Sequence, residues 1–352
     1  MILSIIMSKT DLELIRRLSN AFGPPGAEEE PRQILREELE DSADEVHIDK
    51  LGNIFFHHRG EEGQPTVMLA AHMDEVAFLI TYIEDSGFLR FHPFGGVTPT
   101  VMPGQRIVFR GRQRPLRGIV GTKPPHILTE EEGKKPPVMD ELFIDVGAES
   151  GDEAEEKGFY IGMTGVFDVE FTELGGGYVR GKAFDDRVGC AVMAKVFKSL
   201  EGSSCNLIAV GTVQEEVGLR GARTAAWQIE PDYALAIEGT FAADVPGSRP
   251  HQTSASLKKG AVITIADQSV IAHPKVLQTL ISCAEAEGLP YQFKKMPMGG
   301  TDAGSIHLTK AGIPSGTVAI PCRYIHGPAS VAHMEDIENT ALLIEAFVKR
   351  IQ

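Results

Sequence analysis

Two adjacent glutamates, Glu215 and Glu216, follow an apolar run at residues 207–213. Successive side chains of a regular strand point to opposite faces, so this pair cannot flank a glycosidic bond at the roughly 5–9.5 Å separations that glycosidases need. If the strand ends there, one carboxylate can bind a metal ion while its neighbour accepts a proton from a water whose pKa the metal lowers. We therefore assign Glu215 as a general base and Glu216 as a metal ligand.

Other acidic and histidine side chains also lie beside apolar runs. They are His72 and Asp74 after residues 66–71, Asp185, Glu238 after residues 233–237, and His326 after residues 318–325. A zinc-type cation prefers imidazole nitrogen and carboxylate oxygen, and two cations about 3.5–4 Å apart need a shared carboxylate. We expect Asp185 to be that bridge and Asp74 to orient the His72 imidazole. His333, seven residues beyond His326, is an alternative ligand.

Two further features are given secondary roles. Asp186, next to Asp185, is interpreted as an orienting carboxylate rather than a second ligand. The glycine-rich segment 299–304 lacks the Lys-Ser/Thr pair of a phosphate-binding P-loop. We expect this segment to form a tight loop near the substrate.

Strands and helices alternate around these residues. Helices are predicted at residues 10–18 and up to residue 39, and strands at 45–49, 53–57 and 66–71. The later predictions are helices at 188–200, 221–228 and 274–287 and strands at 206–213, 233–238 and 314–320. Alternation of this kind indicates an α/β fold with a mostly parallel mixed sheet sandwiched by helices, and such sheets bind ligands beyond the carboxyl ends of their strands. The candidate residues are therefore expected to meet at one edge of the sheet.

Residues 76–172 have a different pattern, with short apolar runs separated by glycine and proline. We predict that they form a small β-barrel inserted into the α/β domain, which then consists of residues 1–75 and 173–352. The acidic stretch 149–157 is interpreted as a solvated loop within this insertion.

The composition excludes several classes of function. The chain has 352 residues, 42% of them hydrophobic, and a formal net charge of −15, which argues against a nucleic-acid partner because such proteins need a basic surface. Four cysteines without CxxC spacing indicate reduced thiols in the core. The chain contains no apolar run of 18 residues and the start is a poor signal peptide, so we expect a cytoplasmic protein without a membrane span, whose translation begins at Met1 or Met7.

Five short motifs occur in a fixed order along nearly the whole chain. They are AHMDE at residues 71–75, GKAFDDR at 181–187, QEEVGLRGA at 214–222, GGTDAG at 299–304 and YIHGP at 324–328. Each motif alone has little specificity, but the ordered set resembles the M42 family of dinuclear metallo-aminopeptidases, the tetrahedral or glutamyl aminopeptidase group.

The resemblance implies a zinc-peptidase-like fold with two cations per subunit, usually zinc or cobalt. The implied ligands are His72, Asp185, Glu216, Glu238 and His326, with Asp185 bridging and Glu215 as the base. It also implies a cis peptide bond between Asp185 and Asp186. Many relatives have aspartate where this chain has Glu238. In this family the inserted β domain forms dimers, which assemble into a hollow tetrahedral dodecamer with inward-facing active sites.

The predicted activity is removal of N-terminal residues from short peptides. The alternatives are a deacylase or carboxypeptidase reaction on the same scaffold, a glycosidase, or a non-catalytic metal-binding scaffold. A glycosidase is disfavoured by the adjacency of the two glutamates and by a single tryptophan for sugar stacking. Side-chain preference is left open, because a pocket for acidic residues needs a buried basic group, for which Arg220, Arg323 and Lys258 are candidates.

Overall fold

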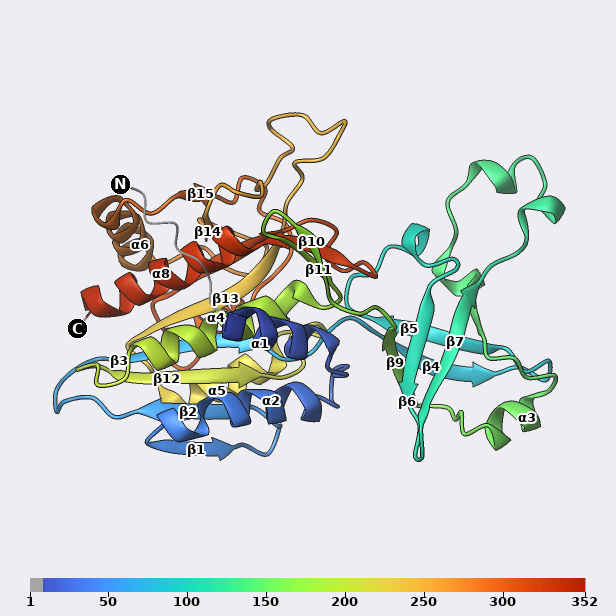
Figure 1. Cartoon of the computed structure of the whole chain (residues 1–352), viewed down its shortest axis with the longest axis horizontal. Helices are drawn as coiled ribbons and strands as arrows, with labels where there is room; N and C mark the ends of the chain where they lie inside the picture. Colours follow the sequence, from blue (N-terminus) through green and yellow to red (C-terminus); the bar gives the residue numbers. More distant parts are fainter. Residues whose placement is uncertain (1–8, 352) are drawn as a thin grey trace.

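The computed structural model describes residues 9–351, and an eight-stranded mixed sheet forms the centre of its larger part (Figure 1). In order across the sheet the strands are β1 (Glu45–Ile48), β2 (Ile54–His58), β12 (Asn206–Thr212), β3 (Thr66–His72), β13 (Tyr233–Phe241), β16 (Ser315–Cys322), β14 (Ala261–Thr264) and β15 (Tyr291–Phe293). The four central strands, from β12 to β16, are parallel, whereas β2 and β14 are antiparallel to their inner neighbours. The predicted mostly parallel sheet is confirmed.

Helices cover both faces of this sheet. One face packs against α1 (Lys9–Asn20), α2 (Glu29–Leu39), α4 (Phe184–Ser199), α6 (Pro274–Glu287) and α8 (Met334–Ile351), and the other against α5 (Arg220–Ile229) and α7 (Ala303–Ile306). Strand β3 is buried on both faces of the sheet. Val67 and Leu69 pack in the hydrophobic core on the face covered by α4, and Met68 and Ala70 pack in the core on the face covered by α5. An unbroken apolar run is thus buried on both sides, as expected for an inner parallel strand.

A three-stranded antiparallel sheet borders this unit. Its strands are β10 (Thr172–Gly175), β11 (Tyr178–Gly181) and β17 (Ser330–His333), with β11 in the middle. Strand β11 ends just before the segment that contains Asp185, and β17 begins just after the loop that contains His326. This small sheet therefore connects two segments of the predicted site.

The second part of the molecule is a closed barrel, seen on the right of Figure 1. In order around the barrel the strands are β4 (Ala77–Ile83), β5 (Leu89–Phe94), β8 (Phe143–Asp145), β7 (Pro115–Gly121), β6 (Arg106–Arg110) and β9 (Thr164–Phe167). Every pair is antiparallel, and Phe78, Phe109 and Phe167 lie in its core. The predicted inserted barrel is confirmed. Short 3-10 turns lie at Glu40–Ser42, Pro99–Val101, Pro125–Ile127, Glu132–Lys134 and Met139–Glu141.

One prediction within the barrel segment is wrong. The acidic stretch expected to be a solvated loop contains a helix, α3 (Gly151–Glu156). The Ser150 side chain accepts a hydrogen bond from the Glu153 backbone N–H at 3.2 Å, and Ala154 is fully buried. A serine N-cap followed by acidic residues in the first turn stabilises a short helix, and this signal outweighs the high charge of the segment.

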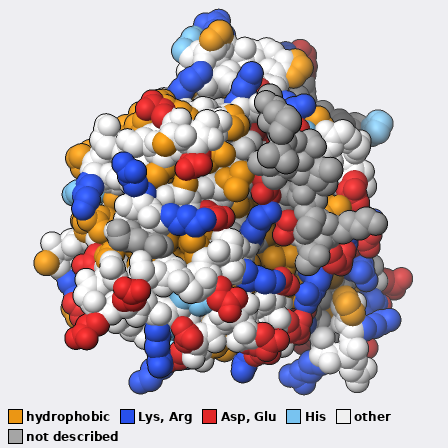
Figure 2. Space-filling model, turned by 60° about the vertical axis from the view of Figure 1, so that its left-hand side comes forward, with side chains coloured by type: hydrophobic (Ala, Val, Ile, Leu, Met, Phe, Trp, Pro, Cys, Tyr) orange, Lys and Arg blue, Asp and Glu red, His pale blue; other side chains and the backbone are white. Residues whose placement is uncertain are grey.

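The surface and the thiols agree with the composition. Lysine and arginine side chains are interspersed with aspartate and glutamate on the face shown in Figure 2, which therefore presents mixed charge. Cys190, Cys205, Cys283 and Cys322 are buried and form no disulfide, as predicted. Among residues 9–351, no helix has the length and apolar character needed to cross a membrane.

Candidate metal centre

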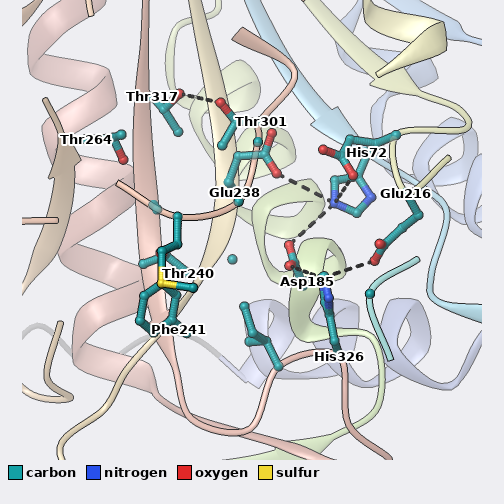
Figure 3. Close-up of a pocket in the computed structure, with 18 of the residues that line it drawn as sticks. His72, Asp185, Glu216, Glu238, Thr240, Phe241, Thr264, Thr301, Thr317 and His326 are labelled. Atoms are coloured by element: carbon teal, nitrogen blue, oxygen red, sulfur yellow. Dashed lines mark hydrogen bonds and ion pairs between the residues drawn. The ribbon is translucent and has the colours of Figure 1, made fainter. Parts of the chain in front are cut away.

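The predicted site residues converge at the carboxyl edge of the parallel strands (Figure 3). His72 is the last residue of β3 and is paired in register with Thr212, the last residue of β12, so the loop containing Glu215 and Glu216 begins beside it. Glu238 lies in the neighbouring strand β13, and Asp185 lies at the start of α4, where its own backbone is not yet helical. The sheet order therefore places four separate chain segments around one point.

Asp185 lies between two histidines. Its Oδ1 is 3.4 Å from His72 Nε2, and its Oδ2 is 3.2 Å from His326 Nε2. Glu238 Oε2 is 3.6 Å from the His72 Nε2, and Glu216 Oε1 is 3.5 Å from the His326 Nε2. These contacts define two sets of potential ligands that share one carboxylate: the His72 group (His72, Asp185, Glu238) and the His326 group (Asp185, Glu216, His326).

The unsatisfied atoms of the site fit a pair of cations. Asp185 Oδ1 and Glu216 Oε1 are buried and have no hydrogen-bond partner among the described residues. Buried carboxylate oxygens are otherwise nearly always hydrogen-bonded, and an unsatisfied one requires an explanation. Within each group the potential ligand atoms lie within 4.8 Å of one another. Histidine nitrogen and carboxylate oxygen in this arrangement are the donor set that zinc-like ions bind.

The carboxylates of the site are close enough to affect one another's ionisation. Burial raises the pKa of Glu215 well above its usual value, and the charge of Glu216 adds to the rise. Burial also raises the pKa of Glu216 to about 7. Burial disfavours the ionised form of Asp185 too, but the two imidazoles beside it hold its pKa below the usual range. Divalent cations would favour the ionised form of each of these groups.

Asp74 links the two sides of the site. The backbone oxygen of Asp74 is 3.1 Å from His72 Nδ1, and its carboxylate Oδ1 is 3.5 Å from the same nitrogen. The carboxylate also accepts hydrogen bonds from the backbone N–H groups of Glu215 at 2.9 Å and Glu216 at 3.1 Å. Asp74 therefore does more than was predicted from its spacing to His72, because it also fixes the backbone of the two glutamates.

The structure places the two secondary candidates, Asp186 and His333, in different surroundings. The Asp186 carboxylate accepts hydrogen bonds from the backbone N–H groups of His72 at 3.2 Å and Gly189 at 3.1 Å, which suits an orienting role. The peptide bond between Asp185 and Asp186 is cis, as the resemblance implies. His333 is in neither group, since its Nε2 lies 3.0 Å from the Gly176 backbone oxygen.

Sequence reasoning assigned no role to Asp302, which contacts a predicted ligand directly. The Asp302 backbone N–H donates to Glu238 Oε1 at 2.9 Å, and its carboxylate accepts a hydrogen bond from the Thr212 hydroxyl at 2.5 Å. Asp302 belongs to the GGTDAG motif, which was interpreted only as a loop near the substrate. The motif marked Asp302 as a residue of interest, but its contact with Glu238 depends on how α7 packs and could not be predicted from the motif.

A buried ion cluster anchors the segments next to the ligands. Lys182 Nζ contacts both oxygens of Glu75, at 2.6 and 2.7 Å, and Arg187 Nη2 lies 3.4 Å from Glu75 Oε1. All three side chains are almost completely inaccessible to solvent. Because Glu75 follows Asp74, and Lys182 and Arg187 flank Asp185, the cluster ties the segment after β3 to the segment before α4.

The site opens into a cavity of about 640 Å³. Glu215 lines this cavity together with the ligands of both groups, and the loop 299–304 contributes part of its wall. Arg220, Arg323 and Lys258, proposed from the sequence as basic groups for acidic substrates, do not line it. Arg323 is instead paired with Asp244 at 2.6 Å. The basic residue in the cavity wall is Lys294, which sequence reasoning did not select.

A shared carboxylate between two histidines, beside a further glutamate in an open cavity, defines a candidate two-metal hydrolase site. A model of the M42 glutamyl aminopeptidase family matches residues 52–343. The chain belongs to this family, whose members are aminopeptidases, and it is a peptide hydrolase.

Individual relatives agree over nearly the whole chain. Aminopeptidase APDkam598 from the archaeon Desulfurococcus kamchatkensis is 43% identical, with a TM-score of 0.92 over 97% of this chain and 95% of its own. The TET1 peptidase of Pyrococcus horikoshii, which can assemble into a tetrahedron or a large octahedral shell, is 32% identical with a TM-score of 0.84 over 96% and 98% of the two chains. The lysyl aminopeptidase of Pyrococcus furiosus is 34% identical over 97% of this chain and 98% of its own.

Proposed function

We propose that this protein is a two-metal aminopeptidase that removes N-terminal residues from short peptides. The His72 group and the His326 group would each hold one divalent cation, zinc or cobalt, with Asp185 shared between them. The observation that supports this most directly is the position of Asp185, whose two oxygens lie 3.4 and 3.2 Å from the Nε2 atoms of two different histidines.

The proposed chemistry divides between the cations and one carboxylate. When bound, the cations supply Lewis-acid polarisation of the scissile carbonyl and lower the pKa of the attacking water. Glu215, which lines the cavity and is not in either ligand group, accepts a proton from that water and donates it to the leaving amine. Asp74 holds the backbone of Glu215 in place through its 2.9 Å hydrogen bond, so the base is positioned before substrate binds.

The test is hydrolysis of aminoacyl-p-nitroanilides by protein stripped with a chelator and then reloaded with zinc or cobalt. We expect cleavage that requires the metal and a free substrate amine, so that N-acetylated substrates are not cleaved. Release of acetate from the acetylated substrates, with the anilide bond left intact, would instead indicate a deacylase. Failure to cleave any free-amine substrate, with both cations bound, would contradict the proposal.

Two adjacent variants separate the base from the ligand. Glu215→Gln is expected to bind two cations per subunit and to lose activity, because it removes only the proton acceptor. Glu216→Gln is expected to lose one cation, because it removes an oxygen that the His326 group needs. Metal content measured by mass spectrometry distinguishes the two outcomes, although the variants differ by one position. Equal metal loss in both would contradict the assignment.

We also propose that the inserted segment 76–172 mediates self-association into a closed shell, as the TET1 relative forms. The barrel and its loops expose large apolar side chains, namely Tyr82, Ile119, Ile127, Val138, Tyr160 and Ile161. Large apolar side chains left in contact with water are candidates for burial in an interface. Light scattering should give a mass of about twelve subunits, and Ile119→Glu should reduce it. A monomeric wild-type protein would contradict this proposal.

A further inference from the structure

The cavity continues from Glu238 across one face of the sheet. Glu238 is paired in register with Ala319, which lies two residues beyond Thr317 on the same strand, and Thr317 is paired with Thr264. Paired residues, and residues two apart, share a face of a sheet. Thr264 and Thr317 are therefore on the face that presents Glu238, and Figure 3 shows them beyond Glu238, on the side away from Glu216.

Lys294 completes this part of the wall. It follows β15 directly, and its backbone N–H donates to the Ile263 oxygen at 3.1 Å, so it lies next to Thr264 at the end of the neighbouring strand. The residue is only 8% exposed, and it lines the same cavity as the proposed metal ligands. A lysine this buried is uncommon unless its charge is paired.

The charge of Lys294 has no ion-pair partner among the described residues, since no carboxylate oxygen of those residues lies within 4.0 Å of its ammonium group. Burial lowers the pKa of Lys294, and the more distant carboxylates of Asp267, Glu238 and Asp185 oppose this effect. Asp267 is already satisfied by other donors, including the Thr301 hydroxyl at 2.9 Å and the Val270 backbone N–H at 2.9 Å. The ammonium group is thus left for a ligand in the cavity.

The surrounding wall is rich in hydroxyl groups. Thr240, two residues beyond Glu238 on β13, and Thr264 have buried hydroxyl oxygens without a hydrogen-bond partner among the described residues. Thr301 and Thr317 contact each other at 3.0 Å between their hydroxyl oxygens. An aliphatic side chain would leave the Lys294 ammonium and the Thr240 and Thr264 hydroxyls unpaired, which costs binding free energy.

From these contacts we infer that Lys294 binds the side-chain carboxylate of the substrate's N-terminal residue, so that the enzyme prefers peptides beginning with glutamate or aspartate. The inference rests on the proposed function, because it takes Glu238 and Asp185 as the groups around the reacting end. Family membership does not decide the preference, since one relative is a lysyl aminopeptidase whereas the family is described as glutamyl.

The test compares two substrates of nearly equal shape, glutamyl- and glutaminyl-p-nitroanilide, which differ in side-chain charge. The wild type should have a kcat/KM for the glutamyl substrate at least about tenfold above that for the glutaminyl one, because an unpaired buried charge is strongly discriminating. Lys294→Met should abolish this ratio, and Lys294→Glu should reverse it and favour lysyl-p-nitroanilide. The exposed neighbour Lys295 supplies the matched control: Lys295→Met should keep the wild-type ratio.

A second measurement separates this inference from the proposed function. Calorimetric titration of the metal-loaded Glu215→Gln protein with free glutamate and glutamine needs no turnover. We expect tighter binding of glutamate, and loss of that difference when Lys294→Met is added. This result would support the role of Lys294 even if no p-nitroanilide were cleaved, in which case only the proposed reaction would be wrong.

Two results would overturn the inference. One is equal binding or cleavage of the glutamyl and glutaminyl ligands by the wild type. The other is a Lys294→Met variant that keeps the glutamyl preference but cleaves leucylglycine and leucylglycine amide equally well, whereas the wild type prefers the dipeptide with the free C-terminal carboxylate. In that case the ammonium group binds the C-terminal carboxylate of dipeptides, as a carboxypeptidase-like site would.

Discussion

The two halves of the metal site are built differently, although they share Asp185. The His72 group rests on the sheet: the His72 side chain is 1% exposed, its backbone N–H is bound by Asp186, and its ring is bound by Asp74. The His326 group rests on loops: the His326 side chain is 32% exposed and the residue has a φ of +57° between β16 and β17. One half is therefore fixed by the core, whereas the other depends on how neighbouring loops pack.

The segment that follows barrel strand β5 packs against the His326 group. Gly95 and Gly96 follow strand β5, and a methyl group placed on Gly96 would lie 3.1 Å from His326 Nδ1. A methyl group on Gly95 would lie 2.6 Å from Glu216 Oε2. The His326 group is thus packed against the inserted domain. We therefore expect a change at Gly95 or Gly96 to act mainly on the cation of the His326 group.

The largest effect is expected where the halves meet. Asp185→Asn removes the shared charge, so both cations should bind more weakly and activity should fall by more than the roughly 10–100-fold that loss of an outer partner costs. Metal content after dialysis, measured with activity, checks this. Asp186→Asn is the matched neighbour, and it should reduce metal content less because its carboxylate accepts hydrogen bonds from the backbone N–H groups of His72 and Gly189 and is in neither ligand group. The reverse order would show that Asp185 is not the bridge.

Replacing His72 and replacing His326 should lower the stability of the protein by different amounts. His72→Ala and His326→Ala are each expected to lose one of the two cations. In the metal-free protein, His72→Ala should lower the free energy of unfolding by about 1–3 kcal/mol because it opens a cavity in the core, whereas His326→Ala should change it by about 0.5 kcal/mol or less. Urea denaturation of the chelated proteins measures the difference. Equal losses of stability would remove the distinction between a core half and a loop half.

Asp74 is expected to affect both halves, since it contacts His72 on one side and the backbone of Glu215 and Glu216 on the other. In Asp74→Asn the amide cannot accept both backbone hydrogen bonds, and we expect metal affinity and activity to fall roughly 10–100-fold. Asp336 is a matched control because its buried carboxylate also accepts two backbone hydrogen bonds, from Lys258 and Gly260, at 2.6 and 2.8 Å.

Asp336→Asn should therefore reduce stability without changing the affinity for either cation, because Asp336 does not line the cavity. Competition with a chelating dye gives both affinities. If Asp74→Asn weakened only the cation of the His72 group, Asp74 would orient the imidazole alone, as its spacing in the sequence suggested.

The sequence predicted the parts of the site that depend on local pattern. An acidic or histidine side chain after an apolar run identifies a strand end, and this was enough to select His72, Glu216 and Glu238 as residues that would meet. It could not show that Asp74 binds the backbone of the glutamate pair, because that contact requires β3 and β12 to be adjacent and in register. Strand order is a property of the assembled sheet, not of either segment.

Lys294 was missed for a related reason. It follows a three-residue strand at the far edge of the sheet, where the local pattern gives little periodicity. Its position in the cavity comes from the pairing of β15 with β14 and of β14 with β16. Of the basic residues selected instead, Arg220 and Arg323 lie in or beside a motif, and Arg220 and Lys258 are exposed in the structure.

The smallest expected effect tests whether the barrel influences one half of the site only. Gly95 has a φ of +83° and Gly104, in the same domain, has a φ of +80°, so replacing either with alanine should cost a similar 1–2 kcal/mol or so of backbone strain. A methyl group on Gly104 meets no atom within 4 Å, whereas one on Gly95 meets Glu216 and Val76. Any difference between the two variants therefore reports the contact rather than the strain.

Gly95→Ala should weaken the cation of the His326 group by about tenfold, which corresponds to a displacement costing about 1.4 kcal/mol, and leave the cation of the His72 group unchanged. Gly104→Ala should leave both affinities unchanged. Chelator competition on the two variants, at matched fractions of folded protein, measures each affinity separately. If Gly95→Ala weakened both cations equally, Asp185 would couple the halves too tightly for the barrel to act on one alone, and the loop-supported half would not be an independent unit.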